Sequence, residues 1–512
     1  MRPFSRAMIV ASACVALLAG LVVPAAQAAD VAVGDQQFSL GLAPEETGTP
    51  GIKGAYIRMW DMGTAWRDIN PRQGEWVWNV MDQRIAQIEQ AGSKPLLVLG
   101  LTPQWAASST AGDPRWGVGT AAPPTDANTY SEYVRQVMNR YGARIGAVEV
   151  WNEANLKTFW DGTAQQMAGL TNRANIIIKA ISPNTLVLAA STTTRLAGSL
   201  KSFVAPYATE LKNLDFPFDA WAVHSYPAAN AGPAKRYADL KSWQDTVTTA
   251  AGTSALSKQI WDTEINYGLA GPGAIPDTDY TGEVATAYIA RTFVDSIRFG
   301  IDVTAWYLWT ASNYGLIGIQ TFSGSPENNA AYSRARDWLS GSTFKGCDAP
   351  QGGILKCNFV KGSPFSLLMS NDDANVSYSV PSGATGQSWT GAPVVGGQTV
   401  TLGTGPVKFT TLNFNAPSVV KSIVITGARA QVSGKPGVKV SGVSTGLSAG
   451  TRLLPFVRFP GQTSYTQGAN VPQVSADESF DWQRKTGKKV YVYFATEDGS
   501  VQSNRVIIPA AY

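Results

Sequence analysis

The stretch AVEVWNE, residues 147–153, is a short run of mainly apolar residues that ends in a carboxylate, Glu153. Seven similar runs lie between residues 37 and 340, and they are rich in the apolar, β-branched and aromatic residues that favour strands. The seven are FSLGLA (38–43), AYIRMWD (55–61), PLLVLGLTP (95–103), TLVLAAST (185–192), FDAWAVHSYP (218–227), QIWDTEINYG (259–268) and DVTAWYLWT (302–310).

Helical patterns separate these runs. Met81, Ile85 and Ile88 keep the spacing of one helix face, and segments 134–141 and 282–300 carry similar apolar stripes. Strands that alternate with helices over about 300 residues predict an α/β fold, a (β/α)8 TIM barrel, with a doubly wound open sheet as the alternative. A barrel would place catalytic groups at the carboxyl ends of its strands, around an open mouth.

The sequence changes character after Trp338. Helical periodicity ends, Gly, Ser and Thr become frequent, and alternating runs such as QTVTLG (398–403) indicate β-structure. We therefore expect the barrel at 29–340, a small β domain at 341–415, and a C-terminal β-sandwich of immunoglobulin or fibronectin type at 416–512.

The first 28 residues predict a secretory signal peptide. Arg2 and Arg6 precede an apolar stretch, and Ala26-Gln27-Ala28 matches a small-residue cleavage site. An uncleaved membrane anchor is the alternative, and no later segment is long and apolar enough to cross a bilayer. We expect a secreted, extracellular protein without a transmembrane span.

Cysteine usage agrees with export. Cys14 lies in the signal segment, so only Cys347 and Cys357 remain, close together in a region rich in Gly. An oxidising compartment favours a disulfide between them, and two free thiols are the alternative.

The charge balance excludes several partners. The net charge of +4 falls to +2 without Arg2 and Arg6, and we find neither a long basic run nor a phosphate-binding loop. No nucleic acid is expected. The chain's single histidine, His224, argues against a metal site, so we expect no metal and no cofactor.

Two carboxylates approach the predicted mouth, Glu153 from the fourth strand and Glu264 from the seventh. Two carboxylates that flank one bond are the equipment for glycoside hydrolysis, because one protonates the leaving oxygen while the other attacks or activates water. The acid needs a raised pKa, whereas the nucleophile stays ionised if Arg or Tyr donors hold it.

The motifs VWNEAN (150–155) and WDTEINYG (261–268), with Arg58, the HSY of 224–226 and Trp309 at other strand ends, resemble the retaining glycoside hydrolases of clan A. The sequence is most similar to family 39 and related secreted bacterial glycosidases. The resemblance covers about 37–345, and Ala154 stands where the commoner Asn-Glu-Pro motif has Pro.

This resemblance implies a role for each matching residue. Glu153 matches the general acid/base and Glu264 the nucleophile, and Asn152 matches the residue that binds the sugar 2-hydroxyl. The other matching residues line the substrate pocket or hold the nucleophile: Tyr226 donates to the nucleophile, Arg58 keeps it charged, His224 lines the pocket, and Trp309 is the platform under the sugar.

Several of these residues have a structural alternative. Arg58 can pair with Glu149 inside the barrel, and His224 can be a satisfied pocket histidine rather than a proton shuttle. Aromatic residues near the mouth can be sugar platforms or core packing, and the candidates are Trp60, Trp105, Trp160, Tyr267 and Tyr314.

The expected function is a secreted retaining glycosidase acting on a polysaccharide or oligosaccharide. The alternative is a barrel that has lost catalysis and serves as a carbohydrate-binding or wall-attachment protein. A metal-dependent hydrolase fits poorly because clustered ligand spacings are lacking. Trp482 and the basic cluster of Arg484, Lys485, Lys488 and Lys489 suggest contact with polysaccharide or a wall polymer, and a solvated spacer face is the alternative.

Overall fold

The fold comes from a computed structural model of the whole chain. It describes residues 30–271, 275–348, 350–410, 422–445, 447, 450–475, 479–497 and 501–511. The predicted signal peptide at 1–28 and the predicted domain boundary at 415–416 lie outside these residues.

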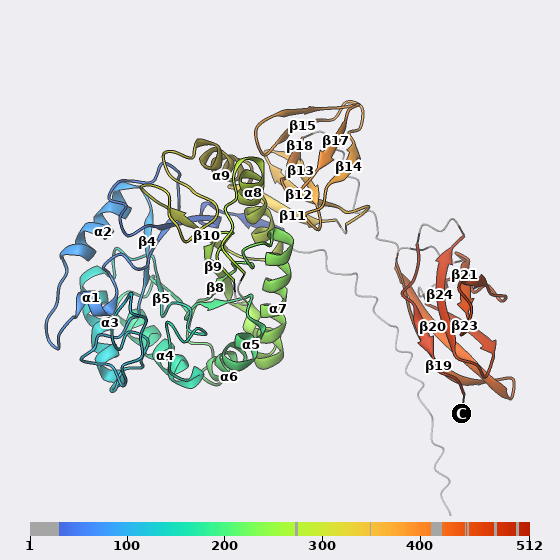
Figure 1. Cartoon of the computed structure of the whole chain (residues 1–512), viewed down its shortest axis with the longest axis horizontal. Coiled ribbons are helices and arrows are strands. Elements are labelled where there is room, and N and C mark those ends of the chain that lie inside the picture. The colour runs from blue at the N-terminus through green and yellow to red at the C-terminus, as the bar shows by residue number, and fades with distance from the viewer. Residues whose placement is uncertain are drawn as a thin grey trace, which may run out of the picture. The chain divides into compact units, whose positions relative to one another are not determined.

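Eight parallel strands form a closed barrel (Figure 1), which confirms the predicted TIM barrel and excludes the open sheet. Strand β6 pairs with β8 to complete the ring, and the short β7 (Thr192–Thr193) lies beside β8. The barrel strands are β2 (Phe38–Leu42), β3 (Tyr56–Met59), β4 (Lys94–Val98), β5 (Ala147–Glu149), β6 (Leu186–Leu188), β8 (Ala220–His224), β9 (Gln259–Ile265) and β10 (Val303–Trp309).

The helices lie around the barrel (Figure 1). Their apolar stripes are buried, as expected for helices that pack against a sheet. Met81, Ile85 and Ile88 are fully buried, as their spacing predicted. The helices are α1 (Trp66–Ile69), α2 (Asn79–Gln90), α3 (Ala127–Tyr141), α4 (Ala164–Ile181), α5 (Ala197–Ser199), α6 (Ala205–Asn213), α7 (Pro233–Ala251), α8 (Gly282–Phe299) and α9 (Pro326–Leu339).

A small β domain follows the barrel and belongs to the same compact unit. Its main sheet has the order β1-β11-β12-β13-β18-β15-β16, and β14 pairs with β17. The disulfide between Cys347 and Cys357, predicted from the sequence, joins β11 to β12. The strands are β1 (Val31–Val33), β11 (Ser342–Cys347), β12 (Ile354–Lys361), β13 (Ser363–Ser370), β14 (Val376–Ser379), β15 (Thr385–Ser388), β16 (Pro393–Val395), β17 (Thr399–Leu402) and β18 (Val407–Phe409).

Strand β1 lies in a different domain from the one that its position in the sequence predicts. The sequence places residues 31–33 in the barrel domain, but they pair antiparallel with β11 in the β domain. The polypeptide therefore begins its described course in the same sheet that it re-enters after the barrel.

Helix α8 lies between the barrel and the small β domain. Arg291 donates to the Ser370 carbonyl at 2.6 Å, and the Trp389 indole donates to the Thr286 hydroxyl at 3.3 Å. Burial along α8 is therefore nearly continuous from Ala285 to Phe299, rather than limited to the one stripe that the sequence predicts.

The C-terminal unit is all-β and is a separate compact unit of the chain. Its two sheets have the orders β19-β20-β23 and β22-β21-β24-β25, and their inward side chains form one core that includes Val438, Val492 and Phe494. The strands are β19 (Ser422–Val432), β20 (Lys435–Thr445), β21 (Leu453–Arg458), β22 (Thr466–Gln467), β23 (Ser479–Lys485), β24 (Val490–Thr496) and β25 (Val506–Ile508).

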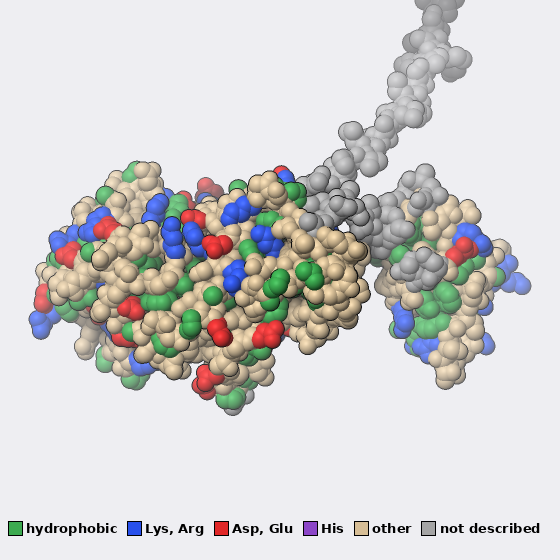
Figure 2. All heavy atoms as spheres, turned by 90° about the horizontal axis from the view of Figure 1, so that it is seen from above, with side chains coloured by type: hydrophobic (Ala, Val, Ile, Leu, Met, Phe, Trp, Pro, Cys, Tyr) green, Lys and Arg blue, Asp and Glu red, His purple; other side chains and the backbone are tan. Residues whose placement is uncertain are grey.

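Acidic and basic side chains are interspersed over the face of the barrel unit that Figure 2 shows. Among the residues that the structure describes, no helix combines the length and apolar character needed to span a membrane.

Candidate active site

Glu153 lies in the loop that follows β5. The sequence predicts that the strand runs to Glu153, but β5 ends at Glu149, so the strand's last residue is a different acid. Glu153 has a φ of +40°, a left-handed conformation that is costly for a residue with a side chain. The Ser191 hydroxyl accepts the Glu153 backbone N–H at 2.9 Å and holds the loop in place. Such local strain is typical of functional positions.

Glu264 lies in β9, and two donors hold its carboxylate. The Tyr226 hydroxyl donates to Oε2 at 2.8 Å, and the Arg58 guanidinium donates to Oε1. Burial raises the pKa of Glu264 above its ordinary value, whereas the charges of His224 and Arg58 and the Tyr226 hydrogen bond oppose this rise. The buried negative charge of Glu264 is thus balanced by Arg58, His224 and the Tyr226 hydroxyl.

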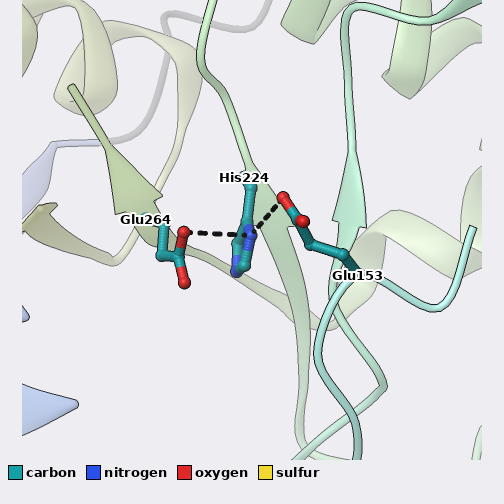
Figure 3. A group of neighbouring side chains, drawn as sticks. All are labelled: Glu153, His224 and Glu264. Carbon is teal, nitrogen blue, oxygen red and sulfur yellow. Dashed lines mark hydrogen bonds and ion pairs between the residues drawn. The ribbon is translucent and has the colours of Figure 1, made fainter. Parts of the chain in front are cut away.

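His224, the last residue of β8, lies between the two acids (Figure 3). Its Nδ1 is 3.0 Å from Glu153 Oε1 and 3.5 Å from Glu264 Oε2, while Nε2 is 3.8 Å from Glu149 Oε1, too far for a hydrogen bond. Burial by itself lowers the pKa of His224, but the charges of Glu264 and Glu153 and the hydrogen bond to Glu153 outweigh burial and raise it.

The two glutamates meet across one opening. One ligand atom from each of Glu153, His224 and Glu264 lies within 4.8 Å of the other two. Carboxyl groups about 5 to 5.5 Å apart are the arrangement of glycosidases that retain configuration, since no water fits between them. The geometry suits attack by one carboxylate and proton donation by the other.

The same three side chains offer a ligand set for a divalent cation. Sequence spacing does not show this cluster, because its members come from the loop after β5 and from strands β8 and β9, which are far apart in the chain. The Arg58 guanidinium, which donates to Glu264 and is buried beside it, adds a fixed positive charge that opposes a cation. We therefore favour acid–base chemistry for this cluster.

Arg58 connects the nucleophile candidate to the barrel interior. Besides Glu264, it donates to both oxygens of Glu149, at 2.9 and 2.8 Å, and to Asn152 Oδ1 at 2.8 Å. The two alternatives from the sequence thus coexist, because Arg58 pairs with Glu149 and with Glu264. Burial alone raises the pKa of Glu149, but Arg58 brings it below its ordinary value. Among the described residues, no group accepts a hydrogen bond from the Asn152 amide nitrogen, which leaves it available to a sugar hydroxyl.

We expect Arg58→Met to lower the free energy of unfolding by about 3–5 kcal/mol, because it leaves two buried carboxylates without their cation. Glu149 and Arg58 are at most 1% exposed, so solvent does not compensate for the loss. Urea denaturation of the wild type and the variant measures the difference.

The double variant Arg58→Met/Glu149→Leu is the matched control. It removes one buried charge together with its partner, so we expect it to regain part of the lost stability. Its turnover should stay low, because Glu264 still lacks its guanidinium donor. A single variant as stable as the wild type would contradict this account of Arg58.

The predicted aromatic platforms separate into two groups. Trp309 ends β10 and donates from its indole to Glu46 Oε2 at 3.1 Å. The Trp60 ring lies 6.0 Å from the Arg58 guanidinium, which donates to Glu264. Trp105 is half-buried and donates to the Asn70 carbonyl at 2.9 Å. Trp160 is 1% exposed and packs edge-on against Trp151, which favours core packing over the predicted sugar contact.

Sequence reasoning missed two groups at the mouth. Tyr307 follows Trp306 on β10, and its ring centre lies 6.1 Å from that of Tyr226. Burial raises the pKa of Tyr307, and the charge of Glu264 adds to the rise. Glu46, in the loop after β2, accepts from Trp309. The position of Glu46 just after the predicted strand 38–43 is the sequence signal for this residue.

A cavity of about 710 Å³ opens between the loops that follow β9 and β10. Tyr280, Tyr314 and Phe322 line it, whereas Glu153 and Glu264 do not. The Tyr314 ring centre lies 6.4 Å from that of Tyr307. Its described lining includes Asp279 and Glu327 but no Lys or Arg. Aromatic rings with polar groups and no cations suit an uncharged sugar. Tyr267, in contrast, is fully buried and hydrogen-bonds Thr292, so it is part of the core.

Comparison with known proteins identifies the family of the chain. The sequence profile of the family described as Glycosyl hydrolases family 39 matches residues 23–310. A search of curated proteins finds no match.

Two solved structures of low sequence identity are similar to this chain, and the first of them shares its fold. A family 39 glycoside hydrolase from the gut symbiont Bacteroides cellulosilyticus WH2 is 17% identical, with 74% of this chain and 82% of that chain covered and a TM-score of 0.51. A family 39 β-xylosidase from Caulobacter crescentus is 15% identical, with 75% and 98% covered and a TM-score of 0.47.

Proposed function

Because this chain belongs to glycosyl hydrolase family 39, whose profile matches more than half of its residues, we propose that it is a secreted glycosidase that retains anomeric configuration. Its substrate is an oligosaccharide or polysaccharide. The observation that carries the proposal is the approach of Glu153 and Glu264 to within 4.8 Å across one opening.

The reaction proceeds in two displacements. Glu264 attacks the anomeric carbon while the bond to the leaving oxygen breaks, and Glu153 gives that oxygen its proton. In the second step, Glu153 takes a proton from water, the water oxygen bonds to the anomeric carbon, and Glu264 leaves as a carboxylate. Two inversions at one carbon give net retention.

The residues around Glu264 support its role as the nucleophile. Tyr226 and Arg58 donate to its two oxygens, which stabilises the ionised form that attack requires. The Glu153 side chain is more exposed than that of Glu264 and lies in the loop after β5 rather than in a strand, which suits proton donation to a leaving group.

The alternative of a barrel that has lost catalysis receives less support. Glu264, Arg58, Tyr226 and Asn152 are all present and joined by hydrogen bonds, and Glu153 is hydrogen-bonded to His224. Burying this many ionisable groups costs stability, so their presence together favours a functional site over a decayed one.

The test of the proposed function is the configuration of the first product. A panel of aryl glycosides and uncharged polysaccharides identifies a substrate, and NMR of the early reaction mixture then follows the anomeric proton. We expect the product to appear in the configuration of the substrate and to mutarotate later. First product of the opposite configuration would exclude the two-step mechanism, and activity abolished by a chelator would indicate a metal instead.

The pH dependence of kcat/KM follows from Glu264. The nucleophile acts only when ionised, and burial raises the pKa of Glu264 above the ordinary value of 4.5. Activity is therefore lost as the pH falls through that raised pKa, and we expect the acid limb of the profile above pH 4.5. Tyr226→Phe removes a hydrogen bond to the carboxylate and should move this limb to higher pH. An acid limb that moves to lower pH would contradict the assignment.

Export and the role of the C-terminal unit belong to the same proposal. The signal-like sequence at 1–28 and the disulfide between Cys347 and Cys357 support an extracellular location. We also propose that the C-terminal unit contacts polysaccharide or a wall polymer. Trp482 does not make this contact, because it is 3% exposed and its ring packs against Phe494 in the core.

A further inference from the structure

One outer sheet surface of the C-terminal unit differs from an ordinary solvated face. Side chains alternate along β21 and β24, so Leu453, Val457, Val490 and Val492 point into the core. The opposite positions of an exposed sheet are normally polar. Here they include aromatic and basic side chains beside the apolar Leu454 and Ile507. We name the aromatic and basic residues, together with those of the flanking loops, the aromatic–basic face: Phe456, Arg458, Tyr465, Lys489, Tyr491, Tyr493 and Arg505.

Three rings of this face, those of Phe456, Tyr493 and Tyr465, form a contiguous strip. Phe456 lies opposite Tyr493 in the β21–β24 register, and the two rings stack with centres 4.9 Å apart and planes 8° apart. Tyr465 meets Tyr493 edge-on at 4.9 Å. All of these side chains are half-buried, so the strip is accessible without projecting far from the sheet.

The cations lie against these rings. The Arg458 guanidinium is 4.3 Å from the Tyr491 ring centre and 5.5 Å from that of Tyr465, and Arg505 is 5.5 Å from the centres of both Tyr465 and Tyr493. Lys489 is 5.4 Å from Tyr491. Stacking on a ring restricts a guanidinium while leaving N–H groups at its edge free to donate.

None of the three cations forms a salt bridge with any carboxylate in the part of the chain that the structure describes. Within the described part of the chain, the one hydrogen bond that Arg458 donates goes to the Gln462 carbonyl, at 3.0 Å. Cations that are held in place without a counter-charge are complementary to carboxylate or phosphate groups.

The charge of the chain is also divided unevenly. Residues 416–512 hold eleven Lys and Arg against five Asp and Glu, a net charge of +6. Residues 29–415 hold 28 basic and 32 acidic side chains, a net charge of −4. Lys and Arg side chains are prominent on the face of the C-terminal unit that Figure 2 shows. Attraction for an anionic polymer therefore resides in this unit and not in the barrel.

We propose that the aromatic–basic face binds an anionic glycan, a chain of sugar rings that bears carboxylate or phosphate groups. The rings supply flat apolar contacts for sugars, and Arg458, Lys489 and Arg505 pair with the anionic groups. Stacked, half-buried rings suit a chain lying along the sheet better than a membrane, which takes up protruding apolar side chains. The choice of a glycan over a nucleic acid rests on the proposed function, because tethering a glycosidase to a glycan raises the local substrate concentration.

The test measures binding of the full-length protein to immobilised polygalacturonate, which bears carboxylates, and to glycerol-phosphate teichoic acid. Dextran serves as the uncharged comparison. We expect binding to at least one anionic polymer, no comparable binding to dextran, and loss of binding at about 1 M salt, where the screening length is about 3 Å. Whichever polymer binds identifies the anionic group.

The double variant Arg458→Ala/Arg505→Ala should weaken this binding by at least about 10-fold, equivalent to about 1.4 kcal/mol. Lys435→Ala/Lys439→Ala removes the same charge from β20 in the other sheet, and we expect it to bind nearly as the wild type does. Turnover of a small aryl glycoside and the unfolding curve, measured for the wild type and both double variants, should be unchanged. The turnover reports on the proposed function separately.

Three results would overturn the inference. They are equal loss of binding in both double variants, binding to dextran as tight as to the anionic polymers, and tighter binding to single-stranded DNA or anionic lipid vesicles than to either polymer. Because binding and turnover are read independently, an inactive barrel would refute the proposed function and leave the measured binding intact.

Discussion

Glu264→Gln is expected to reduce kcat by at least about 10⁴-fold, which corresponds to a rise of about 5 kcal/mol in the barrier. The amide has nearly the shape of the carboxylate but cannot form the glycosyl-enzyme bond. Tyr226 and Arg58, which donate to the carboxylate, lose their charged acceptor in this variant. Steady-state turnover of the best aryl glycoside measures the effect.

Glu132→Gln is the matched control, because Glu132 makes a surface pair with Arg135 on α3 and such pairs contribute little. We expect its kcat to equal that of the wild type. A second control tests whether the loss of activity comes from the missing nucleophile. Glu264→Ala supplied with azide should form a glycosyl azide of inverted configuration, since azide makes only one displacement. Wild-type turnover in Glu264→Gln would refute the nucleophile assignment.

Glu153→Gln is expected to reduce kcat/KM about 10²–10⁴-fold on substrates whose leaving group needs a proton. Leaving groups of low pKa depart without one, so a dinitrophenyl glycoside should form the glycosyl-enzyme almost normally. The covalent intermediate should then accumulate, because the amide cannot deprotonate water. A pre-steady-state burst of released phenol followed by slow turnover is the expected signature.

A uniform loss across leaving groups would contradict the assignment of Glu153 as the acid/base. It would instead indicate that Glu153 positions the substrate or keeps the loop after β5 in its left-handed conformation. Glu153→Asp distinguishes these cases, since it keeps an ionisable group but withdraws it by one methylene.

Much of the fold could be predicted from the sequence because buried parallel strands are short, apolar and regularly interrupted by helices. All eight runs became barrel strands. Closure of the ring followed from their number, and closure brings residues such as Glu153 and Glu264 to one end from distant parts of the chain.

The details of the site were less accessible, because hydropathy does not mark the residue at which a strand stops pairing. The run 147–153 is apolar almost to its end, yet β5 pairs only as far as Glu149, and Glu153 adopts a left-handed conformation in the next loop. The pairing of Arg58 with two acids at once also depends on three-dimensional packing. Trp160 shows the same limit, since its place after a strand end did not reveal that its ring is buried.

Long-range pairing was equally hidden. Strand β1 is three residues long and pairs with β11 more than 300 residues later, and no local pattern encodes such a partner. The aromatic–basic face illustrates the converse case: its strands are readable from alternation, but the sequence singled out the inward-facing Trp482 rather than the outward-facing Tyr491 and Tyr493.

The double-sided burial of α8 makes the barrel inseparable from the sheet that follows it. A fragment cut at residue 340 would uncover Arg291, which is fully buried and donates to the Ser370 carbonyl, and would strip β1 of its neighbour β11. The barrel is therefore not expected to fold independently of the small β domain. A fusion of the barrel to another protein has to include residues through 410 if it is to unfold in a single cooperative transition.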